Sequence, residues 1–521
     1  MPPRLEATTP PKKTSSIQHY ATPPLGDDIS KGACGIAFIS ADRPCKAVTS
    51  RGLHILKCMA SRGAQNLDGT GDGAGVLFYG YQKDYFRSKF QQVGVQVPDG
   101  VTDGKLIFAN FFLTQNASEE EADLLAQQKL ISDALKKYDL ELVGWRDIET
   151  NADAAQLSEY ARKVQPAFKQ AMIVPKDRSK SAYDIEQCCI KASREIEEQV
   201  TEQGNTIDDL HVVSLSLEHI IFKGLLRADQ VASFYPDVNH IVAQGVGDHS
   251  RLATNTNPSW SRAQPCRRLW HNGEFNSILS NVLERQMFSG KKVDISCSDT
   301  QLFEQRIEEL LAQGVPITEA LYRLMQPSPS LSTDPISDLA KACLLAFEAM
   351  EKGYNGPADV IALGYDSMQK PVVTCAIDRG GLRPAQHAEV VVADKEGKPI
   401  TLQYFGSEMP FVDKGDRDLS SSDMYAQVKS CKLIGAGEVV KIDLASGKVI
   451  KGAEVLEEVA NHSKVTKELL EPLPTGAVSD EEVSGGSGVI KNMLIKKLMA
   501  YGWDKSSLDK VTDMLANGKQ S

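Results

Sequence analysis

Cys34 is the residue of this sequence best suited to act as a nucleophile. It precedes the apolar run Gly35-Ile-Ala-Phe-Ile and follows residues 1–33, which are rich in Pro, Ser and Thr. The thiolate is the reactive form of cysteine, so the thiol needs a base. If the peptide bond before Cys34 is cut, the freed α-amine, with a pKa near ~8, can accept the thiol proton. The alternative is a small buried side chain, the commoner fate of a free cysteine.

An Asn-Gly pair, Asn272-Gly273, lies within residues 269–276. Asn-Gly is the strongest short signal for a hairpin turn. The pair also suits an oxyanion hole, because the Asn272 side-chain N–H and the Gly273 backbone N–H could both face a developing oxyanion. Taken alone the pair favours the turn, and the residues leave both interpretations open.

Two charged residues could hold the ends of an amino-acid substrate. Arg251 is either a surface cation or a bidentate clamp for an α-carboxylate. Asp299 stands just before a predicted helix over 302–311, so it is either the N-cap of that helix or an acceptor for an α-ammonium group. Each signal is weak by itself.

The glycine-rich run Gly69–Gly75 has the look of a phosphate-binding loop. It lacks the Lys-Ser/Thr pair of a P-loop and leads into the strand-like run Val76-Leu-Phe-Tyr. A dinucleotide-binding loop should lead into a helix. The sequence therefore argues against nucleotide binding here.

The elements that must position these residues are mainly strands, with helices between them. Strands and helices occur in separate runs, which predicts an α+β fold with mainly antiparallel sheets. The helix over 302–311 should be closed by Gly314. Apolar runs predict a hairpin over 211–217 and 220–225, strands over 359–365 and 372–377, and a second hairpin over 437–444 and 448–451.

Composition excludes several classes of protein. The 521 residues carry 58 basic and 69 acidic side chains, a net charge of −11, which argues against nucleic-acid binding. No segment approaches the ~18 apolar residues of a membrane-spanning helix. The ten cysteines show no C-x-x-C spacing, so no metal site is expected. Scattered cysteines are typical of a reducing compartment, and we predict a cytoplasmic location.

Composition also divides the chain. Residues 1–33 are too polar and Pro-rich to bury a core and should form a disordered leader. The main domain is expected over 34–471, followed by a linker at 472–488 rich in Pro, Gly, Ser and acidic residues. Residues 489–521 carry two short amphipathic patterns, a helical tail too small for its own core.

Several short motifs occur in an order that is informative as a set. They are Cys34-Gly-Ile-Ala-Phe, Ser61-Arg-Gly-Ala, Thr70-Gly-Asp-Gly-Ala-Gly, Ser250-Arg-Leu-Ala-Thr-Asn-Thr, Pro258-Ser-Trp, Arg262-Ala-Gln-Pro, His271-Asn-Gly-Glu-Phe-Asn, Ser298-Asp and Asp378-Arg-Gly-Gly-Leu-Arg-Pro. From Cys34 to about residue 460 the chain resembles the amidotransferase domain of the glutamate synthase large subunit. It departs from that family's usual pattern at Ser61, where His is usual, and at Gly380, where Asn is usual.

The resemblance implies a fold and a reaction. The fold is that of the N-terminal-nucleophile hydrolases, a four-layer αββα sandwich with antiparallel sheets. Cys34 would attack the side-chain amide of L-glutamine, forming a thioester and releasing ammonia. Arg251 would bind the glutamine carboxylate and Asp299 its ammonium. Asn272 and Gly273 would form the oxyanion hole.

The resemblance also implies a partner. Residues 501–504 and 514–518 resemble the start of the family's central region, and the flavin- and iron–sulfur-binding synthase portion does not follow. We therefore expect no cofactor in this chain, with FMN and an iron–sulfur cluster on a separate synthase-like flavoprotein in a hetero-oligomer. That partner would use 2-oxoglutarate or, in an N-alkyl glutamate synthase, an amine. The alternative is a non-catalytic regulatory or scaffold subunit on an amidotransferase fold.

Overall fold

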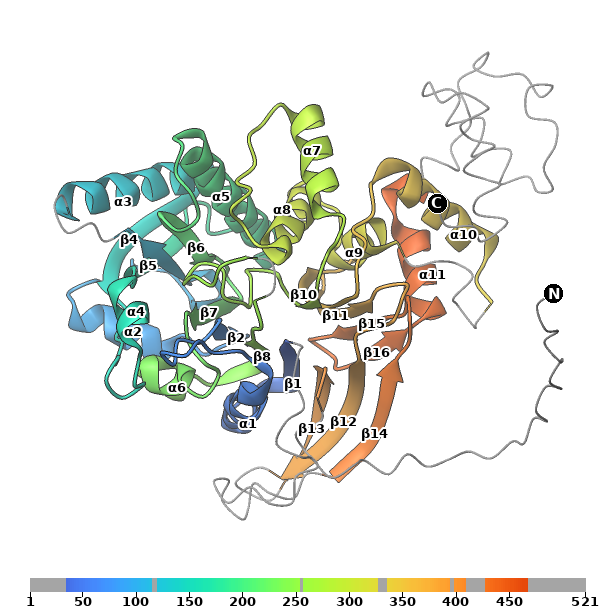
Figure 1. The fold of residues 1–521 in the computed structure, drawn as a ribbon, viewed down its shortest axis with the longest axis horizontal. Helices are drawn as coiled ribbons and strands as arrows, with labels where there is room; N and C mark the ends of the chain where they lie inside the picture. Colours follow the sequence, from blue (N-terminus) through green and yellow to red (C-terminus); the bar gives the residue numbers. More distant parts are fainter. Residues whose placement is uncertain are drawn as a thin grey trace, which may run out of the picture. The chain divides into compact units, whose positions relative to one another are not determined.

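Strand β1 (Gly35–Cys45) begins directly after Cys34 and lies inside the largest sheet. The computed structural model describes residues 34–114, 120–253, 256–326, 335–393, 398–408 and 427–466. The sheet is antiparallel throughout, in the order β14-β12-β13-β1-β8-β2-β7 (Figure 1). Its other strands are β2 (Ala74–Tyr79), β7 (His219–Gly224), β8 (Ala243–Ser250), β12 (Ala385–Ala393), β13 (Pro399–Gly406) and β14 (Gln427–Ile434).

A five-stranded sheet has the order β16-β15-β11-β10-β9. Its strands are β9 (Leu269–Gly273), β10 (Ala358–Tyr365), β11 (Pro371–Ile377), β15 (Val439–Asp443) and β16 (Val449–Lys451). The strands predicted over 359–365 and 372–377 are confirmed, and so is the hairpin over 437–451, because β15 and β16 pair antiparallel.

The third sheet has the order β4-β5-β3-β6. Its strands are β3 (Ile107–Leu113), β4 (Leu140–Asp147), β5 (Ala167–Pro175) and β6 (Leu210–Ser214).

The hairpin predicted over 211–217 and 220–225 is wrong, since β6 pairs with β3 in this sheet and β7 pairs with β2 in the seven-stranded one. The connection between them is held differently from a hairpin turn. The Leu217 N–H donates to the Glu186 carboxylate at 2.9 Å, and the Ser216 hydroxyl accepts from the N–H groups of Glu218 and His219. These bonds direct the chain from one sheet to the other.

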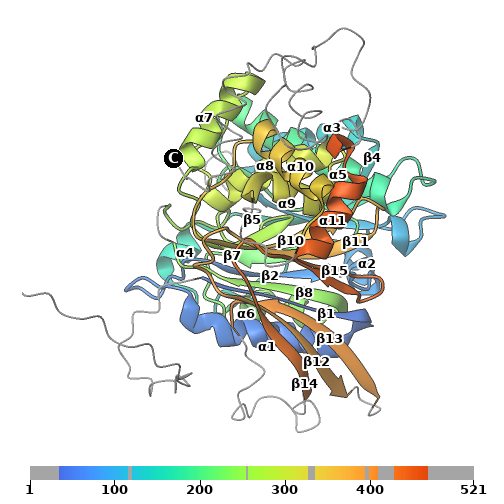
Figure 2. The ribbon, with the colours of Figure 1, turned by 90° about the vertical axis from the view of Figure 1, so that its right-hand side faces the viewer.

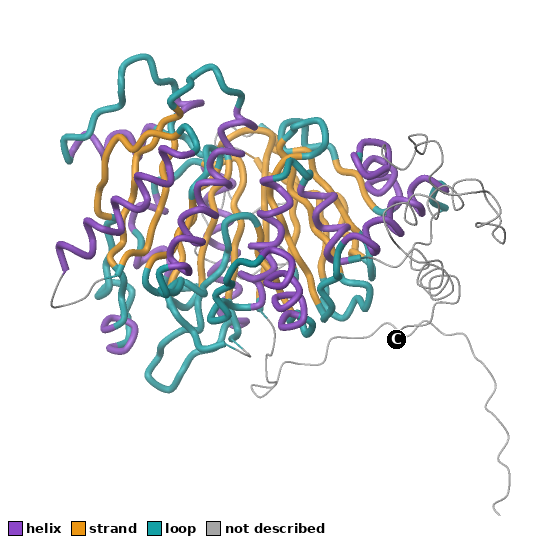
Figure 3. The backbone as a smooth tube through the Cα atoms, turned by 90° about the horizontal axis from the view of Figure 1, so that it is seen from above, coloured by secondary structure: helices purple, strands orange, loops and turns teal. Residues whose placement is uncertain are grey.

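Helices cover the outer faces of the sheets. In Figure 2, α8 to α11 lie above the five-stranded sheet, and α1 lies below the seven-stranded one. In Figure 3, seen from above, helices lie over the strands. The helices are α1 (Lys46–Cys58), α2 (Asp84–Gln92), α3 (Glu120–Lys137), α4 (Glu159–Lys163), α5 (Ala182–Glu202), α6 (Val231–Phe234), α7 (Ile278–Ser289), α8 (Asp299–Ala312), α9 (Ile317–Met325), α10 (Asp338–Met350) and α11 (Ala453–His462).

The alternation of side chains along β10 shows how the core is divided. Ile361 and Leu363 belong to a cluster with Phe38 of the seven-stranded sheet, so this face of β10 points between the sheets. Val360 and Ala362 belong to a second cluster with residues of α8 to α11. Both faces of the sheet are therefore buried, and the expected α+β class with antiparallel sheets is confirmed.

Helix α8 begins at the site and is capped as its sequence allows. Ser298 is the N-cap and forms a capping box with Gln301. Gly314, with φ +81°, follows the last turn and donates its N–H to the Leu311 carbonyl at 2.9 Å. The predicted helix over 302–311 is confirmed, with a start three residues earlier. The predicted leader (1–33), linker (472–488) and tail (489–521) lie outside the described residues.

Candidate active site

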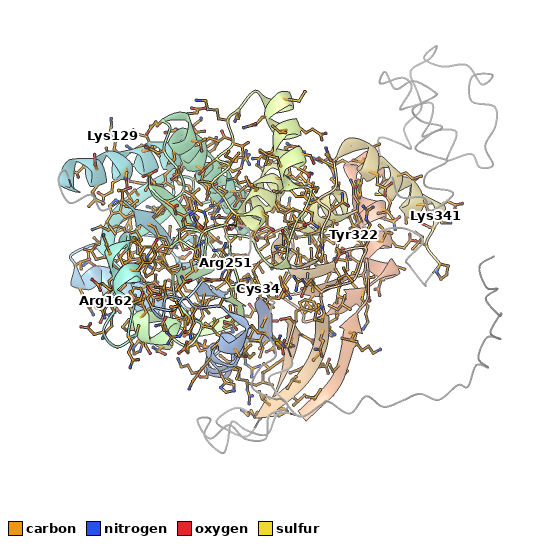
Figure 4. All side chains as sticks on the ribbon, viewed as in Figure 1. Cys34, Lys129, Arg162, Arg251, Tyr322 and Lys341 are labelled. Carbon is orange, nitrogen blue, oxygen red and sulfur yellow. The ribbon has the colours of Figure 1, made fainter. Side chains whose placement is uncertain are left out.

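Cys34 directly precedes β1 and is half-buried beside the end of β8. Its Sγ accepts a hydrogen bond from the Leu252 N–H at 3.2 Å and lies 3.6 Å from the Leu252 carbonyl oxygen. Figure 4 shows Cys34 and Arg251 near the centre of the molecule. Burial raises the pKa of the Cys34 thiol, although the Leu252 N–H and the Arg251 guanidinium oppose that rise. The thiol therefore needs a base before it can react.

A cavity of about 220 Å³ opens over Cys34. Four of the five predicted site residues line it: Cys34, Arg251, Gly273 and Asp299. Apolar side chains from α7, α8 and the loops beside them complete the wall, among them Phe275, Ile278, Val282, Ile295 and Leu302. The structure thus brings together residues that are far apart in the sequence. Asn272, the fifth, is buried immediately before Gly273.

Asn272 and Gly273 are the last two residues of β9 rather than a hairpin turn. They pair with Asp359 and Ala358 of β10, so the turn interpretation is wrong. Gly273 has φ +144°, and a Cβ atom there would lie 1.8 Å from the Pro357 carbonyl oxygen. Only glycine fits this position. A hairpin turn would also have required glycine here. In the folded protein, glycine is required because the Pro357 carbonyl of the adjacent segment lies so close.

Arg251 follows β8 and is buried, with 5% of its surface exposed, so the surface-cation interpretation is wrong. Its guanidinium donates to the Thr256 hydroxyl at 2.8 Å and to the Asp72 carbonyl at 3.4 Å. Its backbone N–H donates to the Gly73 carbonyl at 2.9 Å. The Asp72 carboxylate accepts from the Ala253 N–H at 2.7 Å. The glycine-rich run, which leads into strand β2, therefore supports this arginine.

Asp299 is the first residue of α8, and the predicted N-cap role belongs to Ser298 instead. Ser298 has the extended backbone of an N-cap and accepts from the Gln301 N–H. The Asp299 carboxylate accepts from the N–H groups of Phe275 at 3.0 Å and Thr300 at 2.8 Å. Since it lines the cavity, it presents negative charge beside Cys34 and Arg251.

Three buried polar residues that also line the cavity, Gln264, His271 and Thr300, were not among the sequence-predicted site residues. His271 Nδ1 lies 3.1 Å from the Thr300 hydroxyl and 4.0 Å from the Asp299 carboxylate. Gln264 accepts from the His271 N–H at 2.9 Å and donates to the Thr300 hydroxyl at 3.2 Å. Burial lowers the pKa of His271, which favours the neutral ring, although the Asp299 carboxylate opposes that shift. The motifs Arg262-Ala-Gln-Pro and His271-Asn-Gly contain Gln264 and His271, and Thr300 directly follows the motif Ser298-Asp, so these motifs could have pointed to them.

Metal-binding clusters and membrane-spanning helices are both absent from the described part of the chain. No group of three or more His, Cys, Asp or Glu residues there could hold a metal ion. No described helix has the length and apolar character needed to cross a membrane.

Comparison with known proteins gives a family and several relatives. The family model of the class-II glutamine amidotransferases matches residues 34–467. The chain is 28% identical to the glutamate synthase [NADPH] large chain of Azospirillum brasilense, over 94% of this chain and 31% of that one. It is 26% identical to the chloroplastic ferredoxin-dependent glutamate synthase of Oryza sativa subsp. japonica, over 94% of this chain and 30% of that one.

A third relative, ferredoxin-dependent glutamate synthase 2 of Synechocystis sp., is 26% identical over 82% of this chain and 26% of its own length. The chain thus spans about a third or less of each of these relatives. The family match covers the cavity, Cys34 and every strand of the three sheets. This chain belongs to the class-II glutamine amidotransferases.

Proposed function

We propose that this chain hydrolyses L-glutamine to glutamate and ammonia at the Cys34 cavity and supplies the ammonia to a synthase-type partner. The observation that carries the proposal is the convergence of Cys34, Arg251, Gly273 and Asp299 on one cavity. Cys34 directly precedes β1, Arg251 directly follows β8, and the other two belong to β9 and α8. Each supplies a different group that glutamine requires.

Binding uses the two charged ends of the substrate. The Arg251 guanidinium, which donates to Thr256 and the Asp72 carbonyl, donates its remaining N–H groups to the α-carboxylate of glutamine and pairs with its charge. Asp299, at the start of α8, binds the α-ammonium group. With both ends held, the side-chain amide points to Cys34.

The chemical step begins when cleavage before Cys34 frees its α-amine. The amine takes the thiol proton, directly or through water, and the thiolate attacks the side-chain carbonyl carbon. The Asn272 side-chain N–H and the Gly273 backbone N–H stabilise the tetrahedral oxyanion. The C–N bond breaks, the proton passes from the amine to the leaving nitrogen, and ammonia departs. Water then attacks the thioester, which releases glutamate and restores the thiol.

The fold proposed for this reaction is the four-layer αββα sandwich of the N-terminal-nucleophile hydrolases. Two observations support it. One apolar cluster joins the seven-stranded sheet to the other two sheets. Two further clusters join the outer faces of those sheets to α8–α11 and to α3 and α5. The remaining face of the seven-stranded sheet carries α1, where Gly52 packs against Val246 of β8.

The partner is proposed from the relatives. They are named glutamate synthases, and the chain spans about a third of their length, so the acceptor chemistry belongs to the rest of such a protein. We propose a separate flavoprotein that carries FMN and an iron–sulfur cluster and makes glutamate from 2-oxoglutarate. The described cysteines of this chain form no group of three that could hold a cluster. The predicted cytoplasmic location stays a prediction.

Intact-mass measurement combined with a glutaminase assay tests the proposal. We expect the active form to begin at Cys34 and to release one ammonia per glutamate formed. Active protein that begins at Met1, or protein that begins at Cys34 and lacks glutaminase activity, would favour the non-catalytic subunit. Purification of the chain with its native partners would show whether a flavoprotein accompanies it.

A further inference from the structure

Two buried oxygen atoms without partners lie opposite each other beneath the proposed oxyanion hole. Asn272 Oδ1 and Asp359 Oδ2 are sealed from solvent, and neither has a hydrogen-bond partner among the described residues. Asn272 and Asp359 are 1% and 0% exposed. They are directly paired across β9 and β10. Side chains in such a pair have Cβ atoms about 4.5–5.5 Å apart, within hydrogen-bonding reach.

Both side chains point into the space between the sheets. Trp270 precedes Asn272 by two residues and contacts Phe38 of the seven-stranded sheet, with ring centroids 5.9 Å apart. Ile361 follows Asp359 by two residues and belongs to the same core cluster. Alternate residues of a strand share a face, so Asn272 and Asp359 share this one.

Asp359 is held in a setting that favours the neutral acid. Burial raises its pKa well above the usual range, and the nearby Asp378 adds to the rise. The Cys375 thiol, which donates to Asp359 Oδ1 at 3.6 Å, and the Arg383 guanidinium act in the opposite direction and do not offset burial. A buried carboxylic acid has one O–H, and that donor needs an acceptor.

The Asn272 amide needs its orientation fixed for the reaction proposed above. Its oxygen is buried with no hydrogen-bond partner among the described residues. An amide turned by 180° would present its oxygen to the developing oxyanion and repel it. An ionised Asp359 would favour that wrong orientation, because it could only accept from the amide nitrogen.

We propose that Asp359 is a positioning residue that donates its carboxylic-acid proton in a hydrogen bond to Asn272 Oδ1 and so presents the Asn272 N–H to the substrate. This inference rests on the proposed glutaminase function. Asp359 touches no substrate atom and acts through Asn272 alone.

Kinetics of Asp359→Leu and Asp359→Asn test the proposal. The asparagine retains an N–H donor opposite Asn272 Oδ1, whereas leucine has none. We expect Asp359→Leu to lower kcat about 10- to 100-fold, less than loss of a whole oxyanion donor, with KM within about twofold. Asp359→Asn should stay within about threefold of the parent. Equal losses in the two variants, or unchanged kcat in Asp359→Leu, would overturn the proposal.

Asp248 supplies the matched control. It is also fully buried with no partner for either carboxylate oxygen among the described residues. It lies on β8 beside Gly247, whose missing Cβ would face Trp270, so Asp248 points to the opposite side of the sheet. Asp248→Leu should therefore leave kcat unchanged. A loss like that of Asp359→Leu would show a general effect of removing a buried acid.

A double-mutant cycle shows whether Asp359 acts through Asn272. In Asn272→Ala the group that Asp359 positions is gone, so adding Asp359→Leu should cost no further activity. If the two losses multiply, Asp359 acts elsewhere. Thermal unfolding of every variant identifies losses that come from misfolding.

Infrared spectroscopy gives a readout that needs no activity. The difference spectrum between the parent and Asp359→Asn should contain the C=O stretch of a protonated carboxylic acid, and that band should shift in Asn272→Ala. A missing or unshifted band overturns the proposal. If the parent protein shows no glutaminase activity, the proposed function fails, while the infrared result still decides the hydrogen bond.

Discussion

The segment Arg267–Gly273 has two ends that are built in opposite ways. At its start, Arg267 donates to both oxygens of Glu308, at 2.9 and 2.7 Å, and to the Val212 carbonyl at 3.2 Å. At its end, Asn272 leaves its side-chain oxygen without a described partner, and Gly273 lines the cavity. We call the first the paired end, because Arg267 is buried and fully ion-paired. We call the second the open end, because its residues border the cavity.

The difference suggests that the paired end anchors the segment in the fold and that the open end takes part in the proposed reaction. A buried polar group without a partner costs about 1–3 kcal/mol of stability, so proteins seldom retain one without a use. The paired end holds β9 against α8 and α5, through Glu308 and through Glu197, another partner of Arg267. The open end presents the Asn272 side-chain N–H and the Gly273 backbone N–H for the proposed substrate, while the Asn272 oxygen is the acceptor proposed for Asp359. The following variants test this division, from the largest expected effect to the smallest.

Cys34→Ala should abolish the glutaminase reaction proposed at the cavity beside the open end. Without the nucleophile we expect glutaminase kcat to fall about 10³-fold or more, because no thioester can form. Steady-state ammonia release measures this loss. Cys58→Ala, at an exposed cysteine that ends α1, is the control and should retain parental activity. Retention of activity in Cys34→Ala would remove the proposed mechanism.

Glu308→Ala should break the paired end. It removes one of the two carboxylates that accept hydrogen bonds from the buried Arg267 guanidinium and leaves Glu197 as the other. Losing one member of a buried ion pair costs up to about 3–5 kcal/mol. Urea unfolding should show this loss. Below the unfolding transition, KM for glutamine should match the parent. A changed KM without a change in stability would mean that the two ends are not separate in function.

Asn272→Ala should weaken the open end without unfolding it. Removing one oxyanion donor lowers kcat by about 10²–10³-fold and leaves KM nearly unchanged, because the interaction forms in the transition state. The variant should stay folded, with a free energy of unfolding lower by about 1–3 kcal/mol, because the buried Asp359 acid loses its acceptor. An effect confined to KM would assign Asn272 to substrate binding instead.

Arg251→Lys should act on binding. Lysine keeps the charge but cannot make the planar two-point contact with a carboxylate. We expect KM to rise about 10- to 100-fold, with a smaller change in kcat. Arg262→Lys is the control, because Arg262 is paired with Asp208 at 2.8 Å and does not line the cavity. Equal effects of the two variants would remove the proposed role of Arg251.

Asp248→Leu should show that an unpartnered buried acid without a function is dispensable. Burial raises the pKa of folded Asp248. The parent is therefore most stable, relative to the variant, below the unfolded pKa of about 4, and loses that stability as pH rises toward the folded pKa. At pH 7 the variant should be more stable by about 1–2 kcal/mol. Unfolding free energies at pH 5 and 7 measure the trend, and a constant difference would contradict it.

Local patterns in the sequence predicted those elements whose signals are local. The β15–β16 hairpin follows from Ala445-Ser-Gly447 between two apolar runs. Helix α8 follows from its apolar stripe and Gly314. The predicted hairpin of β6 and β7 failed because both strands are buried throughout, and such runs do not reveal which sheet each one joins.

The site shows the same division. The sequence by itself determined the residue types and the order of the motifs that the family match over 34–467 bears out. The tertiary structure decided which residues meet. It places Cys34 against Leu252, 218 positions away, and Asp359 opposite Asn272. It also shows that Gly273 is required by the nearby Pro357 carbonyl and not by a turn.

The physical reason lies in the range of the interactions. Caps, turns and amphipathic patterns act over a few residues, so they can be read from a short stretch of sequence. Strand pairing depends on which arrangement buries the apolar faces of all three sheets together, and no single segment contains that information. The Cys34 cavity forms where ends of the seven-stranded and five-stranded sheets meet α7 and α8, so only the folded chain could show it.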